Sequence, residues 1–369
     1  MKKNLQKILV LALGLTTTIA SAQFSANSVS RINNTMDDAR SMDNRIALSA
    51  DYGAVHVSAD VNHATNGTGT GYTIYEAYAS TDLMGFGTLT IGRQDLSFGS
   101  GALLSGSDWN LNSRNTEDGI SFNANLGGFD VSLGTIGGDA GDVDYGMNSY
   151  MNASGNFGGA DFNVLMMAKG DAKAHGYDLS YEMNNFSVSA SMNSDFDGAE
   201  YTSYGLTYNV SDDLSASFGR TSYGDDVELE AAVPSIPFSD GTPDSVSGIA
   251  AVMSGGFGDA SYNTNAAQGW GAGNMGYLNA NDEATSMGIS YDLGDITVSY
   301  TMTTITNDTD ADGDGNADTE DREVSVMSLS YQLNDNCNIG LSRFADSNHD
   351  TSGDWDGGER TYLSVSIDR

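Results

Sequence analysis

The chain has 369 residues, a formal net charge of −35 from 50 acidic and 15 basic residues, 45 glycines, three prolines and one cysteine. This acidic excess leaves no positive surface for phosphate groups, so nucleic acid is excluded as a partner. After residue 22 no apolar run is long enough to cross a membrane as a helix. The single cysteine, Cys337, excludes a disulfide scaffold and cysteine-based zinc sites.

The first 22 residues have the pattern of an export signal. Three lysines precede the apolar stretch 8–15, and the segment closes with the small residues Ala20-Ser21-Ala22. A basic start, a short apolar centre and a small-residue cleavage site are typical of a secretory signal peptide. We therefore expect residues 1–22 to be removed and the mature chain, 23–369, to begin at Gln23.

From about residue 45 onward, apolar and polar residues alternate with a period of two. This period predicts strands with one apolar and one polar face. The polar positions are rich in Ser, Thr, Asn and Gly. The clearest examples are Ile120–Leu126, Phe129–Leu133, Phe186–Met192, Tyr204–Val210 and Ile296–Met302.

Four of these strands end in nearly the same way, with a tyrosine two residues before the last apolar residue. Each is followed by a few turn residues and another alternating segment, so the repeated unit is a hairpin. A tyrosine at one height in successive hairpins predicts the aromatic girdle of a membrane β-barrel. The four tyrosines are Tyr181, Tyr208, Tyr291 and Tyr331.

The connections between the predicted strands alternate between short and long. Short turns are expected near residues 51–53, 84–86, 127–128, 157–159, 184–185, 211–213, 294–295 and 334–336. Longer polar connections are expected near residues 34–44, 63–71, 99–118, 138–144, 196–200, 224–283, 307–322 and 347–358, with one shorter connection near 171–174. Barrels with tight periplasmic turns and long outer loops show this alternation. With a first strand at 23–33, the count is about eighteen strands; sixteen is the alternative.

A sheet can cross hydrocarbon only if it closes on itself, because every backbone N–H and C=O must be paired internally. The predicted fold is therefore all-β: a transmembrane antiparallel β-barrel with short periplasmic turns and long extracellular loops. A barrel of about eighteen strands is too wide for side chains to fill, so its polar face would line a water-filled lumen. A soluble β-sandwich or β-solenoid is the alternative, but the fixed repeat that a solenoid needs is absent from the sequence.

A region of about 45 residues carries a resemblance to a known family. Tyr75-Glu76-Ala77-Tyr78 is followed by a short turn, then by Ile91-Gly92-Arg93-Gln94, and then by a loop with Asp108-Trp109 and Arg114. This order resembles Gram-negative outer-membrane porins, particularly the alginate-export type of barrel. The resemblance implies an outer-membrane location, contact with outer-membrane lipid and lipopolysaccharide, and a homotrimer. The chain departs from the alginate-export pattern in its few basic residues and in ending at Arg369 instead of an aromatic residue.

Three predicted ascending strands end in a small residue followed by arginine, at Arg93, Arg220 and Arg343. Strict alternation places these arginines on the apolar face at the outer rim, where they would reach lipid headgroups. Alternatively, a bulge at Gly92 or Gly219 turns the arginine into the lumen. With Glu76, the three arginines are the pore-lining candidates.

An acidic segment within 307–322 has the spacing of a calcium loop. Oxygen-bearing residues at loop positions 1, 3 and 5, a glycine at position 6 and acids at positions 9 and 12 are the pattern of calcium ligands. A solvated acidic loop without a metal is the alternative. The predicted Ca²⁺ ligands are Asp310, Asp312, Asp314, Asn316, Asp318 and Asp321, with Glu320 as the alternative to Asp321.

The longest connection, 224–283, contains all three prolines and several apolar pieces. Loops of this length are usually functional or disordered. We expect part of it to fold into the barrel mouth and narrow it; an external cap or a surface-binding loop is the alternative.

The predicted function is that of a porin, a passive diffusion channel for small hydrophilic solutes whose acidic walls favour cations. A calcium-dependent surface or adhesive barrel and a substrate-specific saccharide channel are the alternatives. An enzyme is not expected, because the four histidines lie apart in the sequence and no catalytic motif is present.

Overall fold

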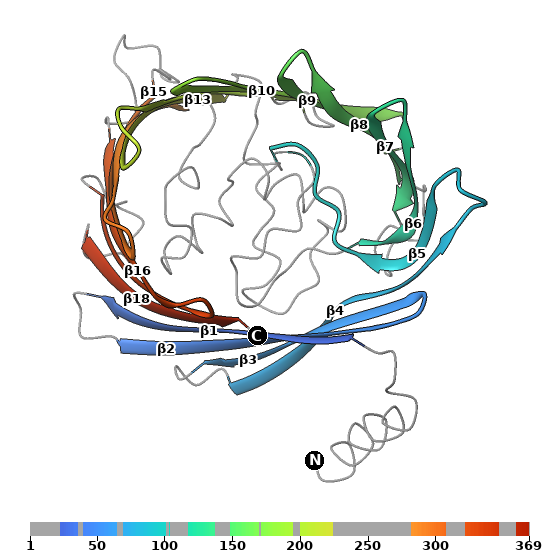
Figure 1. Ribbon diagram of the computed structural model, residues 1–369, viewed down its shortest axis with the longest axis horizontal. Helices are drawn as coiled ribbons and strands as arrows, with labels where there is room; N and C mark the ends of the chain where they lie inside the picture. The colour runs from blue at the N-terminus through green and yellow to red at the C-terminus, as the bar shows by residue number, and fades with distance from the viewer. Residues whose placement is uncertain are drawn as a thin grey trace, which may run out of the picture.

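The computed structural model is a ring of antiparallel strands (Figure 1). The residues that the structure describes are 23–35, 40–64, 69–100, 103, 117–136, 148–169, 171–194, 200–223, 282–307, 322–346 and 359–368. Within them, no helix is long and apolar enough to cross a membrane.

Eighteen strands follow one another along the chain. They are β1 (Gln23–Thr35), β2 (Arg40–Tyr52), β3 (Val55–Ala64), β4 (Gly69–Asp82), β5 (Thr88–Gln94), β6 (Glu117–Leu126), β7 (Phe129–Ile136), β8 (Asn148–Phe157), β9 (Ala160–Lys169), β10 (Ala172–Met183), β11 (Phe186–Ser194), β12 (Glu200–Asn209), β13 (Leu214–Tyr223), β14 (Asp282–Asp292), β15 (Ile296–Asn307), β16 (Arg322–Asn334), β17 (Cys337–Asp346) and β18 (Glu359–Asp368).

The sheet is closed. Every strand pairs antiparallel with the next one along the chain, and β18 pairs with β1. Closure leaves no strand edge with unpaired backbone groups. The predicted all-β antiparallel barrel is confirmed. The count is eighteen and not sixteen because both uncertain strands are present: β1 lies between β18 and β2, and β8 lies between β7 and β9.

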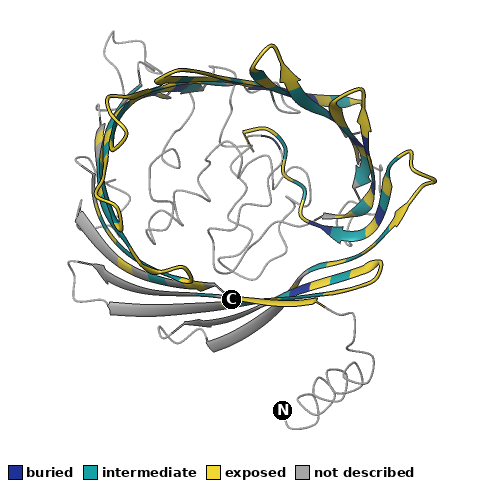
Figure 2. Cartoon of the chain, in the orientation of Figure 1, coloured by how far each residue is buried: buried dark blue, intermediate teal, exposed yellow. Residues whose placement is uncertain are grey.

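The two faces of the barrel wall differ in chemistry, as the alternation predicts. In β10 the side chains of Tyr177, Leu179 and Tyr181 are exposed, whereas the residues between them are more buried. The same alternation of exposed and less exposed residues runs along β12 and β14, and exposed and less exposed residues follow one another along much of the coloured wall in Figure 2. Large apolar residues occupy the exposed positions. They include Leu206, Phe218, Met287, Ile289 and Leu341.

The predicted girdle tyrosines belong to this exposed, outward face. Tyr181, Tyr208 and Tyr291 are 37%, 38% and 44% exposed, and Tyr331 is half-buried. Each precedes a short turn, so the four lie near the same end of the barrel. Tyr208 stacks on Phe186 of the neighbouring strand, with ring centroids 4.6 Å apart. Aromatic residues at this height are typical of barrels that meet a membrane interface.

The short turns have the residues that tight hairpins need. Gly127 and Gly128 both have positive φ, at 66° and 97°, and connect β6 to β7. Two-residue hairpin turns with positive φ at both positions favour glycine, because it has no Cβ to clash. The predicted short turns are confirmed at one end of the barrel. At the other end the connections after β5, β7, β13, β15 and β17 are long, as predicted, but those after β1 and β3 are only residues 36–39 and 65–68, shorter than the predicted 34–44 and 63–71, because the flanking strands extend further.

Several predictions concern parts of the chain that the structure does not describe. The signal peptide, the calcium-loop residues 310–321 and the C-terminal Arg369 lie outside the described residues. Residues 224–281 of the longest connection do so as well. These predictions therefore remain predictions.

Candidate functional site: a chain segment inside the lumen

The segment that follows β5 runs inside the ring. Residues 95–100, drawn in teal in Figure 1, leave the wall at the end of β5 and extend toward β9 and β10. The described residues of this segment are 95–100 and Leu103, and we call them the inner segment. Because the inner segment contacts the polar side chains of β8–β11, those polar side chains face the lumen and the exposed apolar ones face outward.

An apolar patch on the inner wall lies beneath the inner segment. Leu165, Met167 and Ala174 point inward from neighbouring strands and are 1%, 3% and 1% exposed. Leu103 is also 1% exposed. A Cβ placed on Gly176 would lie 3.0 Å from Cδ1 of Leu103, so Leu103 packs directly over this glycine. Burying a leucine stabilises such a contact by about 1.5–3 kcal/mol.

Tyr150 of β8 extends the patch toward β7. Its side chain is 4% exposed, and its hydroxyl lies 3.3 Å from the hydroxyl of Ser132. The ring lies over Gly134, where a Cβ would collide with it. Phe98 of the inner segment packs against Tyr150 with ring centroids 5.2 Å apart. The inner segment therefore makes apolar contacts with the wall through Phe98 and through Leu103.

A row of polar side chains crosses β8–β11 beside the apolar patch. Asn152 donates from Nδ2 to Oδ1 of Asn163 at 2.6 Å, and Asn163 donates from Nδ2 to Oδ2 of Asp178 at 3.2 Å. Ser191 donates to Oδ1 of Asp178 at 2.6 Å, and its hydroxyl lies 3.0 Å from that of Ser100. Asp178 accepts from both sides, so its carboxylate is the centre of the row.

Gly99 is required where the inner segment meets this row. Its φ is 58°, in the left-handed region, and a Cβ there would collide with the side chains of Asp178 and Asn163. Glycine satisfies both demands, since it adopts positive φ readily and allows close backbone approach.

Glu76 lies on the inner face, as a pore-lining residue must. Ser58 donates to Oε2 of Glu76 at 3.2 Å, and the backbone N–H of Asp95 donates to Oε1 at 3.3 Å. His56 Nε2 lies 3.3 Å from the same carboxylate, while His56 Nδ1 lies 2.6 Å from Asp51. Glu76 therefore binds the start of the inner segment and lies in a small charged cluster.

The three arginines of the repeated strand endings lie on the outward face. Arg93 has the same strand parity as the exposed Ile91, and Gly92 causes no register shift against β4 or β6. Arg220 follows the parity of the exposed Phe218, and Arg343 that of the exposed Leu341. Regular alternation thus places them with the lipid-facing side chains and not in the lumen, because the bulge that would have turned them inward is absent at these described positions.

Two of these arginines pair with acids on a neighbouring strand. Arg93 donates to both carboxylate oxygens of Asp118, at 3.1 and 2.8 Å. Arg220 donates to both oxygens of Glu283, at 2.8 and 2.7 Å. Pairing neutralises charges that would otherwise face the lipid boundary.

Charged side chains are distributed unevenly between the faces. The Lys and Arg residues whose side chains the structure describes, Arg93, Lys173, Arg220 and Arg343, all lie on the outward face. The inner face of the described wall carries the acids Asp51, Glu76, Asp130, Asp161 and Asp178. Among the described residues, no group of three or more His, Cys, Asp or Glu side chains is arranged to hold a metal ion.

The inner segment was not predicted from the sequence, which instead assigned the constriction to residues 224–283. A signal for it exists in β9, where Val164-Leu165-Met166-Met167 is apolar at four successive positions. An unbroken apolar run in a strand indicates that both of its faces are covered. Within a barrel, the inner cover must come from another segment of the chain.

The comparisons with known proteins concern the fold. No protein-family model matches the sequence, and no curated protein matches it. The outer membrane protein OpdK of Pseudomonas aeruginosa is similar in structure, with 13% identity, a TM-score of 0.62, and coverage of 95% of this chain and 99% of OpdK. A structure of OpdK with vanillate has 12% identity, a TM-score of 0.64, and coverage of 95% and 98%.

A third similar structure is OccK2 (OpdF) of the same organism in complex with glucuronate. It has 14% identity, a TM-score of 0.60, and coverage of 95% of this chain and 98% of OccK2. These similarities extend over almost the whole of each chain. The alginate-export subgroup receives no support from them and remains a prediction. The chain has the fold of the outer-membrane protein OpdK and its OccK relatives.

Proposed function

We propose that this protein is an outer-membrane porin, a passive diffusion channel for small hydrophilic solutes that favours cations. The observation that carries the proposal is the closed eighteen-strand barrel with large apolar side chains outside and hydroxyl, amide and carboxylate side chains inside. An outer face of this kind suits lipid, and a polar inner face suits water.

The presence of the inner segment favours a narrowed channel and not a freely open one. It occupies part of the lumen and is held by contacts to β8–β11. A solute that passes it must move close to the wall, where side chains can distinguish one solute from another.

The preference for cations is supported by the distribution of charge. Acids lie on both faces of the described wall, and those on its inner face include Glu76, Asp130 and Asp178, whereas the lysine and arginine side chains that the structure describes lie outside. Carboxylates along a water-filled lumen raise the local concentration of cations and lower that of anions. An exporter of an acidic polysaccharide, which the narrower resemblance implies, would need the opposite charge pattern.

A second candidate is a substrate-specific channel. It is favoured by the inner segment and by the likeness to OccK2, whose structure was determined in complex with glucuronate. The two candidates differ in saturation: a specific channel shows a solute flux that levels off with concentration, while a general channel shows a linear flux.

Two further predictions belong to the same proposal. We expect Ca²⁺ to bind the acidic loop through Asp310, Asp312, Asp314, Asn316, Asp318 and Asp321, which calorimetry with CaCl₂ would detect.

We also expect a homotrimer in lipid, with lipopolysaccharide at the outer rim. A monomer on native gels after extraction in mild detergent would contradict the trimer.

The direct test of the proposed function is conductance in a planar lipid bilayer. The purified protein is expected to give stable open channels, and a salt gradient is expected to give a reversal potential of the sign for cation preference. A folded barrel that gives no channels would contradict the porin proposal. Channels that prefer chloride would overturn the cation preference alone.

A further inference from the structure

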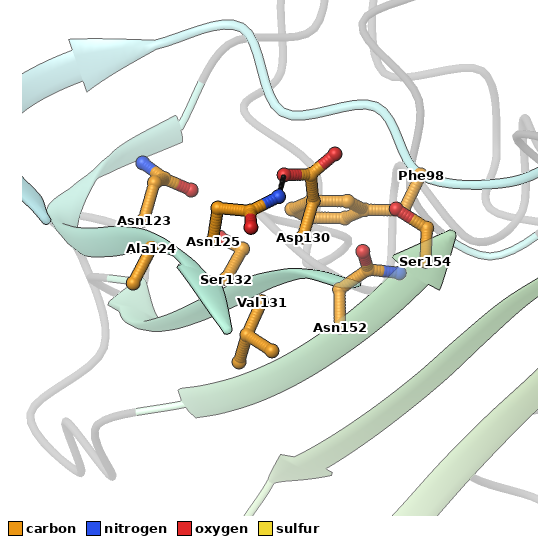
Figure 3. Close-up of a pocket in the computed structure, with 9 residues that line it drawn as sticks. All are labelled: Phe98, Asn123, Ala124, Asn125, Asp130, Val131, Ser132, Asn152 and Ser154. Carbon is orange, nitrogen blue, oxygen red and sulfur yellow. Dashed lines mark hydrogen bonds between the residues drawn. The ribbon is translucent and has the colours of Figure 1, made fainter. Parts of the chain in front are cut away.

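A pocket of about 370 Å³ lies on the inner wall between Phe98 and strands β6, β7 and β8 (Figure 3). Its volume falls within the range of about 300–1,000 Å³ that is typical of small-molecule sites. None of the four predicted pore-lining residues lines this pocket; they are Glu76, Arg93, Arg220 and Arg343. Figure 3 shows the ring of Phe98 on one side and polar side chains from the three strands around it.

The polar side of the pocket is a regular grid. In the strand register, Asn123 pairs with Ser132 and Ser132 pairs with Asn152. One step closer to the turns, Asn125 pairs with Asp130 and Asp130 pairs with Ser154. Three strands and two inward-facing rows thus make a polar floor of about 10 Å by about 7 Å, from the usual strand spacing and rise per residue.

Several hydrogen-bonding groups on this floor have spare capacity. In the part of the chain that the structure describes, the side chains of Asn123 and Ser154 make no hydrogen bond. Asn152 uses its Nδ2 to bind Asn163 and the carbonyl of Val164, which leaves its Oδ1 to accept. The pocket therefore has both donors and acceptors for a ligand, since an amide and a hydroxyl each supply both.

The rest of the floor is fixed in place. Asn125 donates to Oδ1 of Asp130 at 2.9 Å and accepts from the backbone N–H of Gly128 at 3.1 Å. These contacts tie Asp130 to the β6–β7 turn. Phe98 is held in turn by its packing on Tyr150. The aromatic ring and the carboxylate thus face the same space from held positions.

From this geometry we infer that the pocket is a subsite for a neutral monosaccharide ring on its way through the channel. A flat aromatic ring opposite a grid of amides and hydroxyls suits a solute with an apolar ring face and a rim of hydroxyl groups. The floor has the dimensions of a single sugar ring. The carboxylate of Asp130 accepts hydrogen bonds from hydroxyl groups and repels a carboxylate-bearing sugar.

This inference rests on the proposed channel function, because the solute must reach the lumen. It differs from that function in naming the solute class and the residues that retain it. It also separates this chain from OccK2, whose structure holds glucuronate, an acidic sugar.

The test uses the full-length mature barrel in a planar bilayer, with D-glucose added as the probe. D-Glucose is expected to block the ion current transiently, in a concentration-dependent way. D-Glucuronate, which adds a carboxylate to the same ring, and sorbitol, which has hydroxyls but no ring face, are expected to block much more weakly. Equal block by all three solutes would overturn the inference.

Two substitutions locate the site. Phe98→Leu removes the flat ring but keeps an apolar side chain, and Asn123→Ala removes the Asn123 amide from the floor of the pocket. Each is expected to weaken the block by D-glucose by about fivefold to tenfold, the effect of losing about one such contact. Asn209→Ala, on the inner face of β12, is the matched control and is expected to leave the block unchanged. Unchanged block in both pocket variants would overturn the assignment.

A second measurement does not depend on conductance. Saturation-transfer NMR on the refolded barrel in detergent is expected to show transfer to D-glucose that falls in both pocket variants and persists in Asn209→Ala. Saturation transfer to D-glucose from a barrel that gives no open channels would support the sugar subsite and contradict the porin proposal. Open channels without any transfer or block would uphold the porin and overturn the sugar subsite.

Discussion

The inner wall of the barrel has two regions that differ in side-chain size. In β8–β10, beneath the inner segment, the inward-facing residues include Tyr150, Leu165 and Met167, all buried. In β12–β15 no described inward-facing side chain is an apolar residue larger than alanine. That region has mostly Ser, Thr and Gly, including Ser203, Thr207, Ser217, Gly219, Ser286, Gly288, Thr301 and Thr303.

This difference shows what decides the composition of a barrel's inner face. Large apolar residues point inward where another part of the chain covers them, since exposing them to a wet lumen has a free-energy cost. Elsewhere the wall has short hydroxyl side chains that pair across strands or bind water. An example is Thr221, which donates to Ser203 at 3.2 Å.

The largest effect is expected when the inner segment loses its contact with the inner wall. Leu103→Ala removes the side chain that packs over Gly176, with a loss of about 2–5 kcal/mol for a buried leucine. The inner segment is then expected to detach from the wall and the single-channel conductance to rise. Leu206→Ala, on the outward face of β12, is the control and should leave conductance unchanged. Equal conductance in Leu103→Ala and the unaltered protein would mean that the inner segment does not narrow the channel.

The contact between Leu103 and Gly176 can also be disrupted by a substitution in the wall. In Gly176→Val, the added side chain would collide with Asn193 and press on Leu103. The expected result is again a higher conductance, accompanied by faster cleavage of the inner segment by an added protease. If the variant folds and has the same conductance and the same rate of protease cleavage as the unaltered protein, the packing at Gly176 is not what holds the inner segment.

An intermediate effect is expected at the charged cluster where the inner segment begins. Glu76→Gln removes one luminal charge, worth about 1 kcal/mol to an ion that passes about 4 Å away in water. The ratio of potassium to chloride permeability should therefore fall, most clearly at low salt where screening is weak. Glu283→Gln, an outward-facing acid, should leave the ratio unchanged. A ratio that responds equally to both substitutions would place the selectivity outside the lumen.

The smallest effect is expected at the outer face. Arg93→Gln removes a cation that pairs with Asp118 on the outward side of the wall. Reversal potentials should not change, because the side chain does not border the conducting water. A shift toward stronger cation preference would instead mean that Arg93 contributes to the field inside the pore.

The sequence predicts the barrel well because the barrel depends on local pattern. Period-two alternation, turns such as Gly127-Gly128, and the tyrosines of the girdle each report on neighbouring residues, so the eighteen strands could be counted. The same alternation also placed Arg93, Arg220 and Arg343 outward, and only the added hypothesis of a bulge turned them inward. Gly92 does have a φ of 127°, yet the register continues through it without a shift.

The site could not be predicted in the same way, because it depends on contacts between distant parts of the chain. Ser100 meets Ser191, 91 positions away, and Leu103 meets Gly176. The small residues around Gly99 look like an ordinary outer loop in the sequence. Only the apolar run in β9 indicates that something covers the inner wall, and it does not say which segment does so.

The central claim is that one face of each strand meets lipid and the other meets water, and two neighbouring residues on β13 test it most directly. After Cys337 is replaced by serine, single cysteines are introduced as Ser217→Cys, on the inner face, and Phe218→Cys, on the outer face, in barrels refolded into lipid vesicles. The account predicts that a charged, water-soluble thiol reagent modifies position 217 and lowers the conductance, while position 218 is protected from it and a probe there is quenched by brominated lipid. Equal reaction of the charged reagent with both positions would contradict it.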